Sequence, residues 1–214
     1  YQNKINEFVD KDNLINNYCF GNFYPTESDK IYKKDSIYEF VIRSIDKKFI
    51  EQMQEFLSKD NSNYFLEILS TTKKEIDQFF IRELYSATPV IVSDKRDERG
   101  KQLYWSLHYN GDISALQNHL QKNLEKKLRQ FYPEDEAVSS NFIQEIEMKN
   151  RKPQSIYLKL IRNKKQQLVR LIGNKFKIVP NEDELSQKLA FLSLGVGLGE
   201  KSSFGGGFCL GRGI

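Results

Sequence analysis

The order of strand and helix patterns along the chain constrains its fold more than any single motif. In the first third of the 214 residues, an initial helical pattern is followed by two strand patterns, a helix that Asp46 would cap, and a third strand pattern. This order is βαββαβ without its first strand. The expected helices span residues 1–10 and begin at Asp46, and the expected strands span residues 18–24, 37–43 and 64–69.

The same alternation occurs a second time after a connector near residues 71–74. Its longest helix begins at Asp112 or Ser114, repeats apolar residues at steps of three and four, and ends before Pro133. The other expected segments are strands over residues 76–82, 89–92, 103–109, 142–148, 156–161 and 168–172, a helix over residues 183–194, and a final strand.

From this repetition we predict an α+β fold of two tandem ferredoxin-like (RRM-like) βαββαβ domains, residues 1–72 and residues 73–214. The first domain lacks its first strand in this numbering. Because the chain starts at Tyr1, within a helical pattern and without a methionine, we expect that strand to lie upstream of the given sequence.

Glycines are crowded at the C-terminus, where the last twenty residues hold eight of the twelve. Glycine permits positive φ angles, and successive exposed N–H groups in such loops bind anions. A cation and two hydroxyls lie within the run, so the segment predicts a phosphate-binding loop. It is not a P-loop, because GxxxxGK[ST] is absent and the helix precedes the glycines. The expected binding residues are Gly197, Gly199, Lys201, Ser202, Ser203 and Gly205.

A disordered tail or an expression remnant would also explain a glycine-rich terminus. Apolar residues on both sides of the loop argue against these alternatives, because they indicate two short strands that hold it. They are Leu192, Leu194, Val196 and Leu198 before the loop, and Phe204, Phe208 and Leu210 after it.

A second candidate region is a block of one charge sign between Met148 and Asn181, with ten basic residues and no acidic one. Apolar residues are interleaved with the basic ones, which indicates strands with a basic face and favours a nucleic-acid partner. The alternative is a merely solvated sheet face, which normally mixes both signs. The residues expected to bind RNA here are Lys149, Arg151, Lys152, Lys159, Arg162, Lys164, Lys165 and Arg170.

Other classes of protein receive no support from the sequence. Cys19 and Cys209 form no CxxC pair, and His108 and His119 are not spaced as metal ligands, so we expect no disulfide framework, no metal and no cofactor. No apolar run approaches the ~18 residues of a membrane span, and no signal peptide is visible. We therefore expect no membrane partner and a cytoplasmic location.

The segment Gly197-Leu-Gly-Glu-Lys-Ser-Ser-Phe-Gly-Gly-Gly-Phe208, which follows a helix, resembles the glycine-rich signature of the sixth CRISPR-associated family. These are the repeat-processing endoribonucleases of the RAMP superfamily. Residues 20–23, 84–92 and 123–132 are similar, in the same order, to the family's Phe-rich strand, its apolar strand with Pro, and its helix of "NL..K" type.

This resemblance implies a protein that binds the repeat of a CRISPR precursor transcript and cuts it once without a metal. The family's 2′-hydroxyl attacks the adjacent phosphate, which gives a 2′,3′-cyclic phosphate and a 5′-hydroxyl. The chemistry needs a group that accepts the 2′-OH proton, cations that stabilise the phosphorane, and an acid for the leaving oxygen.

The chain departs from the family where many members carry a histidine, at the end of the first helix. It has Phe8-Val-Asp-Lys11 there, and we expect His108 and His119 to be structural. Some members are thought to work with lysines. Lys4, Lys11 and Lys201 are therefore the candidate catalytic residues, with charge stabilisation as their role.

Two other functions stay open. The chain could be a non-cleaving RNA-binding subunit of a CRISPR effector or maturation complex, which the missing histidine favours. It could also be an interaction module whose glycine loop binds a protein partner through backbone hydrogen bonds. Association with other CRISPR effector subunits and a homodimer are both compatible with the sequence.

Overall fold

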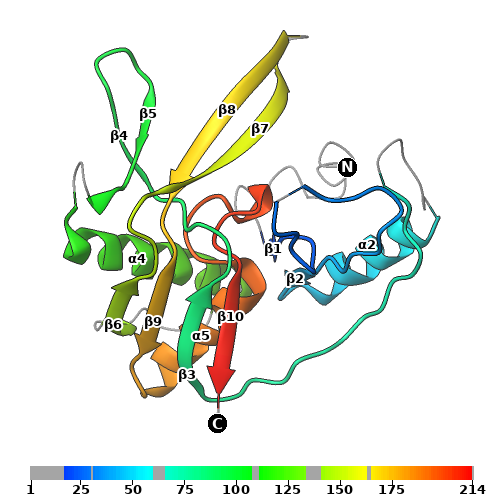
Figure 1. The fold of residues 1–214 in the computed structure, drawn as a ribbon. Helices are drawn as coiled ribbons and strands as arrows, with labels where there is room; N and C mark the ends of the chain where they lie inside the picture. Colours follow the sequence, from blue (N-terminus) through cyan, green and yellow to red (C-terminus); the bar gives the residue numbers. More distant parts are fainter. Residues whose placement is uncertain are drawn as a thin grey trace.

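A computed structural model describes residues 17–29, 31–59, 66–107, 111–133, 141–162 and 165–213 (Figure 1). For residues 161, 162 and 165 only the backbone is described. The helix expected over residues 1–10, the candidates Lys4, Lys11 and Lys164, and His108 lie outside the described residues.

A four-stranded antiparallel sheet forms the centre of the C-terminal part, with the strand order β10-β3-β9-β6. Helices α4 (Ile113–Phe131) and α5 (Glu184–Val196) complete the chain order strand, helix, strand, strand, helix, strand. This is the ferredoxin-like βαββαβ unit. The strands are β3 (Ile81–Ser86), β6 (Ile143–Met148), β9 (Phe176–Pro180) and β10 (Cys209–Gly213).

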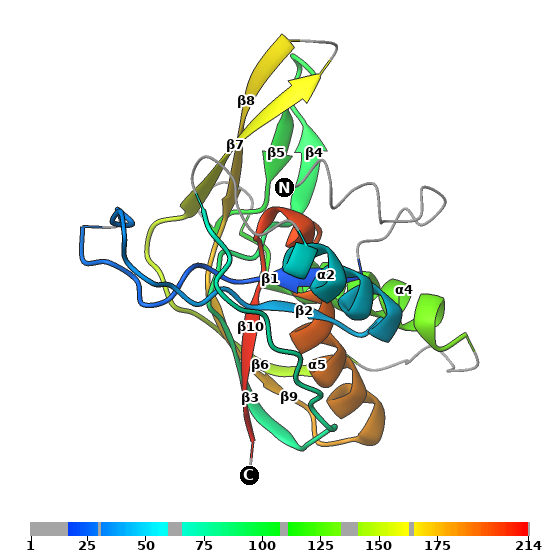
Figure 2. The same ribbon diagram turned by 90° about the vertical axis from the view of Figure 1, so that its right-hand side faces the viewer.

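Both helices cover one face of this sheet (Figure 2). Helix α4 begins where Asp112 accepts hydrogen bonds from the amides of Ser114 (2.8 Å) and Ala115 (3.2 Å), and Asp183 caps α5 in the same way. Both helices confirm the sequence prediction, and of the two expected starting residues of α4 it is Asp112 that caps the helix. Four leucines of α4 at steps of four are buried between helix and sheet, and each contributes about 1.5–3 kcal/mol by leaving water. They are Leu116, Leu120, Leu124 and Leu128.

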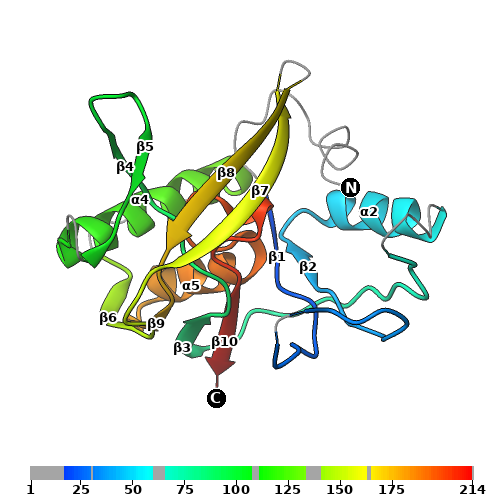
Figure 3. The same ribbon diagram turned by 45° about the horizontal axis from the view of Figure 1, so that its top comes forward.

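Two hairpins are inserted into this unit and project from the same end of it (Figures 1 and 3). Strands β4 (Ser93–Arg96) and β5 (Gln102–Tyr104) lie between β3 and α4 in the chain. Strands β7 (Gln154–Arg162) and β8 (Lys165–Gly173) lie between β6 and β9, and they form the strand pair expected from the basic block.

The N-terminal part packs against α5 and the glycine-rich segment. Strands β1 (Tyr18–Phe20) and β2 (Ile42–Ser44) pair antiparallel, and α2 (Lys47–Lys59) follows with its cap at Asp46, as predicted. Tyr18 stacks on Phe49 of α2 with ring centroids 4.9 Å apart, and this contact begins a second, smaller core. The fold class is α+β with ferredoxin-like units, as expected, and β1, β2 and α2 are the part of the N-terminal unit that the described residues contain. The boundary at residues 72 and 73 stays a prediction.

Several expected segments differ from the structure. Residues 66–80 contain a single bridge, at Glu67, and no strand. The strand expected over residues 76–82 therefore begins at Ile81, and residues 89–92 form isolated bridges. Residues 192–196 belong to α5, so the idea that a strand precedes the glycine loop was wrong. Strand β9 was missed, although its alternate residues are buried.

The described residues contain no helix that is long and apolar enough to cross a bilayer. They also contain no group of three or more His, Cys, Asp or Glu side chains that could hold a metal ion.

Candidate nucleic-acid interface

The glycine loop, residues 197–207, takes backbone conformations and close contacts that demand glycine. Gly199 and Gly207 have φ angles of 77° and 67°, in the left-handed region. A Cβ atom at Gly207 would lie 1.8 Å from the carbonyl oxygen of Leu198, and one at Gly199 would lie 2.5 Å from that of Ile91. These glycines therefore have a packing role that is independent of any ligand.

Most backbone N–H groups of the glycine loop are already hydrogen-bonded, either within the loop or to neighbouring segments. The amide of Gly206, for example, donates to the carbonyl of Lys201 at 3.0 Å. Ser202 and Ser203 are buried, whereas Lys201 is partly exposed. An anion-binding nest would thus have fewer free amides than expected, and binding of RNA by this loop stays a prediction. The amides paired within the protein are those of Gly197, Leu198, Glu200, Phe204, Gly205, Gly206 and Gly207.

The loop lies at the junction of the two halves of the molecule. A Cβ at Gly205 would lie 3.0 Å from the ring of Phe20 on β1. Beside it, Arg43 of β2 donates to the carbonyl of Cys209 at 2.7 Å, and its guanidinium lies 4.5 Å from the ring centre of Phe208. The position of the loop is therefore set by both halves.

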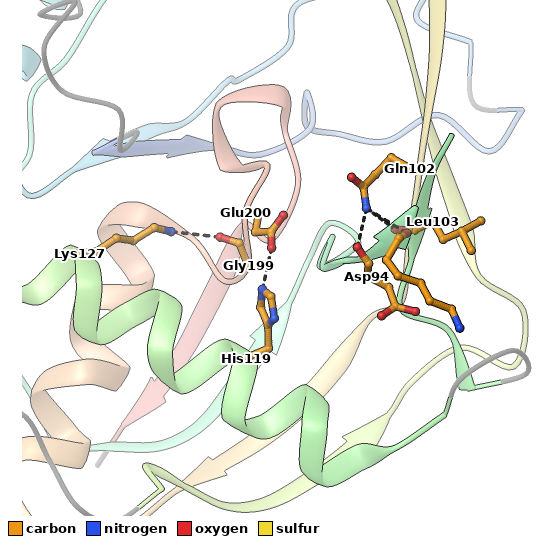
Figure 4. Close-up of polar contacts among 8 residues, drawn as sticks. Asp94, Gln102, Leu103, His119, Lys127, Gly199 and Glu200 are labelled. Atoms are coloured by element: carbon orange, nitrogen blue, oxygen red, sulfur yellow. Dashed lines mark hydrogen bonds and ion pairs between the residues drawn. The ribbon is translucent and has the colours of Figure 1, made fainter. Parts of the chain in front are cut away.

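Helix α4 holds the start of the loop through Lys127, which is only 3% exposed. Its ammonium group donates to the carbonyls of Val196 (3.3 Å), Gly197 (3.2 Å) and Gly199 (3.2 Å), as Figure 4 shows for Gly199. Burial lowers the pKa of Lys127 from 10.5 to about 8. The sequence analysis gave Lys127 no role, although a lysine beside Leu124 and Leu128 in an apolar stripe is a usable signal.

A second contact between α4 and the loop joins His119 to Glu200, with Nε2 2.6 Å from Oε1 (Figure 4). Burial alone would raise the pKa of Glu200, but hydrogen bonds from His119 and Ser93 outweigh it and hold this pKa below its usual value. Glu200 is therefore ionised at neutral pH. Ser93 is the first residue of β4, so the loop is also tied to the base of that hairpin.

One extended segment, residues 88–92, connects the glycine loop to the base of the β7–β8 hairpin. On one edge, Pro89 accepts from Gly207 (2.8 Å) and Ile91 accepts from Glu200 (3.0 Å). On the other edge, Val90 donates to Asn174 (2.8 Å), just after β8 ends. The two regions that the sequence analysis assigned to RNA binding are therefore neighbours at one end of the molecule (Figure 3).

The β7–β8 hairpin carries exposed cationic and aromatic side chains on one face. Tyr157 and Arg170 are opposite each other in the ladder, and so are Lys159 and Leu168. The guanidinium of Arg170 lies 5.7 Å from the ring centre of Tyr157 and donates to Ser155 at 2.9 Å. Tyr157 is 61% exposed, so it lies outside the core and is accessible to a base.

The basic block does not form a single free face. Lys149 pairs with Glu147 at 2.9 Å, and Lys177 pairs with Glu83 of β3. Burial lowers the pKa of Lys175. Glu147, at the edge of the basic block, and Glu83, which is distant in the sequence, thus supply carboxylates that the block lacks. Arg151, Lys152, Lys159 and Arg170 are exposed, while Arg162 and Lys165 form the last backbone pair of the ladder.

The fold and the site together define a class of protein. It is an α+β protein with a ferredoxin-like sheet in the order β10-β3-β9-β6, two helices on one face of the sheet and a glycine-rich loop after the second helix. Comparison with family models is more specific: "CRISPR associated protein Cas6, C-terminal" matches residues 70–210. This chain belongs to the Cas6 family.

Solved structures with the same fold agree with that assignment. A protein described as "CRISPR associated protein Cas6" is 20% identical with a TM-score of 0.63, over 97% of this chain and 87% of that one. A Cas6-related protein from Pyrococcus furiosus is 17% identical with a TM-score of 0.58, over 92% and 79%. "An RAMP protein binding different RNA substrates" is 15% identical with a TM-score of 0.61, over 99% and 88%. No curated protein sequence matches the chain significantly.

Proposed function

We propose that this protein binds the repeat of a CRISPR precursor RNA and cleaves it once, by metal-independent attack of a 2′-hydroxyl on the adjacent phosphate. The products are a 2′,3′-cyclic phosphate and a 5′-hydroxyl. Membership of the Cas6 family supports this proposal. A similar fold, with a TM-score of 0.51 and 10% identity, belongs to a structure described as a Cas6 product complex.

The observation that carries the proposal is the position of the glycine loop beside the base of the β7–β8 hairpin, on the two edges of residues 88–92. RNA phosphates that contact Lys159 and Arg170 on the hairpin would continue toward Lys201 in the loop. Recognition of this kind reads the shape and charge of an RNA stem more than its sequence.

Within this proposal, Lys201 stabilises the negative charge of the phosphorane. It is the candidate catalytic lysine in the described residues, is partly exposed, and has its backbone fixed where its carbonyl accepts from Phe204 (3.1 Å) and Gly206 (3.0 Å). A cation held on such a turn stabilises charge that develops in the transition state without reorganising. Lys4 and Lys11 keep the same proposed role.

The test is incubation of the full chain with its repeat RNA in EDTA. We expect one cut, and we expect a 2′-deoxy substitution at the cleaved nucleotide to abolish cutting while binding persists. Lys201→Ala should slow single-turnover cleavage much more than it weakens binding, whereas Lys74→Ala, an exposed lysine of the connector, should change neither. Cutting of the deoxy RNA would overturn the proposed chemistry.

A non-cleaving RNA-binding subunit of a CRISPR complex is the second candidate. The segment Phe8–Lys11, which has no histidine where many family members carry one, favours it. In the same experiment, tight retention of uncut RNA with a steep dependence on salt would support this function. Equal losses of binding and cleavage in Lys201→Ala would assign Lys201 to binding alone.

A further inference from the structure

The β4–β5 hairpin has no part in the ferredoxin-like sheet and was not expected to bind anything. It is inserted between β3 and α4, pairs only with itself, and projects from the end of the molecule that carries β7–β8 (Figures 1 and 3). A surface element that adds nothing to the sheet calls for another role, and such loops often bind ligands.

The turn of this hairpin is ordered by its own hydrogen bonds. Asp97 Oδ1 accepts from the amides of Arg99 (3.0 Å) and Lys101 (2.8 Å), and Arg96 donates to the carbonyl of Gly100 at 3.1 Å. Across the strands, Gln102 donates to the carbonyl of Asp94 at 2.7 Å, as Figure 4 shows. The turn therefore needs little ordering when a partner binds it.

The base of the hairpin is fixed to the proposed RNA-binding region. Trp105, directly after β5, is buried with its ring 5.9 Å from that of Phe176, and its amide donates to Val92 at 2.9 Å. Ser93 is hydrogen-bonded to Glu200 of the glycine loop. Strand β5 also contacts β8. The two hairpins thus have adjoining bases, and their tips diverge (Figures 1 and 3).

Cationic side chains lie along this hairpin and at its turn. Lys95, Arg99 and Lys101 are exposed, and none of the three forms an ion pair with a described residue. The hairpin also carries Asp94, Asp97 and Glu98, and the Asp97 carboxylate accepts two backbone amides of the turn. Free cations on a rigid projection are suited to phosphate groups.

We infer that the β4–β5 hairpin is a second RNA-binding element, whose Lys95, Arg99 and Lys101 contact phosphates of a base-paired segment held at the same time by β7–β8. This inference rests on the proposed function. Two elements that diverge from adjoining bases fit a duplex, whose phosphates lie on both sides of its grooves. A flexible single strand needs no such second contact.

The experiment compares two triple variants of the full chain that remove the same charge. One is Lys95→Gln, Arg99→Gln and Lys101→Gln, and the control is Lys34→Gln, Lys48→Gln and Lys74→Gln, all exposed residues of the N-terminal part and the connector. Each is titrated with a stem-loop RNA and with an unstructured RNA of equal length, at several salt concentrations. Because all six side chains are exposed, both variants should fold as the wild type does, which circular dichroism checks.

We expect the hairpin variant to bind the stem-loop at least about tenfold more weakly, with the slope of log K against log salt reduced by about two to three. Its affinity for unstructured RNA should fall less, and the control should bind both RNAs within about twofold of wild type. Unchanged stem-loop binding, while Lys159→Gln with Arg170→Gln weakens it, would overturn this inference and leave the proposed function intact. Equal losses for both RNAs would overturn the duplex assignment, and a wild type that binds neither RNA would remove the proposed function itself.

Discussion

The ammonium group of Lys127 lies 3.2 Å from the carbonyl oxygen of Gly199, so a buried cation on α4 holds the glycine loop by its backbone. Its other acceptors are the carbonyls of Val196 and Gly197, at the C-terminal end of α5. The dipole of that helix places partial negative charge there, which favours a cation. Lys127 thus holds the glycine loop through hydrogen bonds to backbone carbonyls, which do not depend on the side chains of the loop.

Replacing Lys127 by methionine, which is similar in length and uncharged, should destabilise the protein. Three carbonyl oxygens lose their donor in this variant, and a buried polar group without a partner costs about 1–3 kcal/mol. Part of this loss is offset, because the variant no longer has to bury a cation. We expect a net loss of about 1–3 kcal/mol in the free energy of unfolding by urea denaturation. Lys126→Met, at the exposed neighbouring position, is the control, and equal stability of the two variants would contradict this role.

The stabilising effect of Lys127 should depend on pH. Burial lowers its pKa to about 8, and the unfolded chain keeps the ordinary value of 10.5. Between these values the unfolded state binds the proton that the folded state has released, so the stability of wild type relative to Lys127→Met should rise by about 3 kcal/mol. Below pH 8 the lysine is protonated in both states and the difference should be flat. Urea denaturation of both proteins from pH 7 to 10 measures this difference in the free energy of unfolding. If wild type lost stability relative to Lys127→Met as the pH rises, the lowered pKa of Lys127 would be refuted.

Two alanine substitutions separate the packing role of the glycine loop from ordinary backbone strain. Gly207→Ala introduces a Cβ 1.8 Å from the Leu198 carbonyl oxygen at a φ of 67°, so we expect failure to fold or a loss above about 4 kcal/mol. Gly100→Ala has a similar φ of 74° but nothing within 4 Å, and should cost only about 1–2 kcal/mol. Thermal unfolding followed by circular dichroism compares them. If the two variants lost similar stability, the glycine loop would be able to shift and make room for the Cβ at residue 207.

Arg43 should couple the N-terminal strand pair to the C-terminal sheet. Its bond to the carbonyl of Cys209 and its contact with the Phe208 ring both cross that junction. Arg43→Met should lower the free energy of unfolding by about 2 kcal/mol, the size of a hydrogen bond to a charged group. It should also speed labelling of Cys209, whose thiol pKa burial raises. Arg82→Met, on an exposed position of β3, should change neither the free energy of unfolding nor the labelling rate of Cys209. If Arg43→Met behaved like this control, other contacts would hold the two halves together.

Local patterns predicted much of the fold. The periodic leucines and the expected start at Asp112 or Ser114 place α4 correctly, and the helix expected over residues 183–194 matches α5, because these signals act within a few residues. Of the strand expected over residues 64–69, residues 64 and 65 lie outside the described residues and residues 66–69 hold one bridge, and β9 was missed. Whether an apolar stretch becomes a strand depends on a partner that is distant in the chain.

The candidate site could be predicted only in part. The glycine loop and the β7–β8 hairpin were found because glycine crowding and charge are properties of composition. Lys127 and the pair of Lys177 with Glu83 were not, because each joins segments far apart in sequence.

The sequence alone therefore determined the family resemblance, the α+β alternation and the two regions that carry glycine and positive charge. Only the tertiary structure decided that these regions are neighbours, that most loop amides are already paired, and that a second cationic hairpin adjoins them. The physical reason is the separation along the chain over which each signal acts, because propensity, capping and charge density depend on a few neighbouring residues. The bridges of Val90 with Asn174 and of Ile91 with Gly199 instead join residues that are far apart in the sequence.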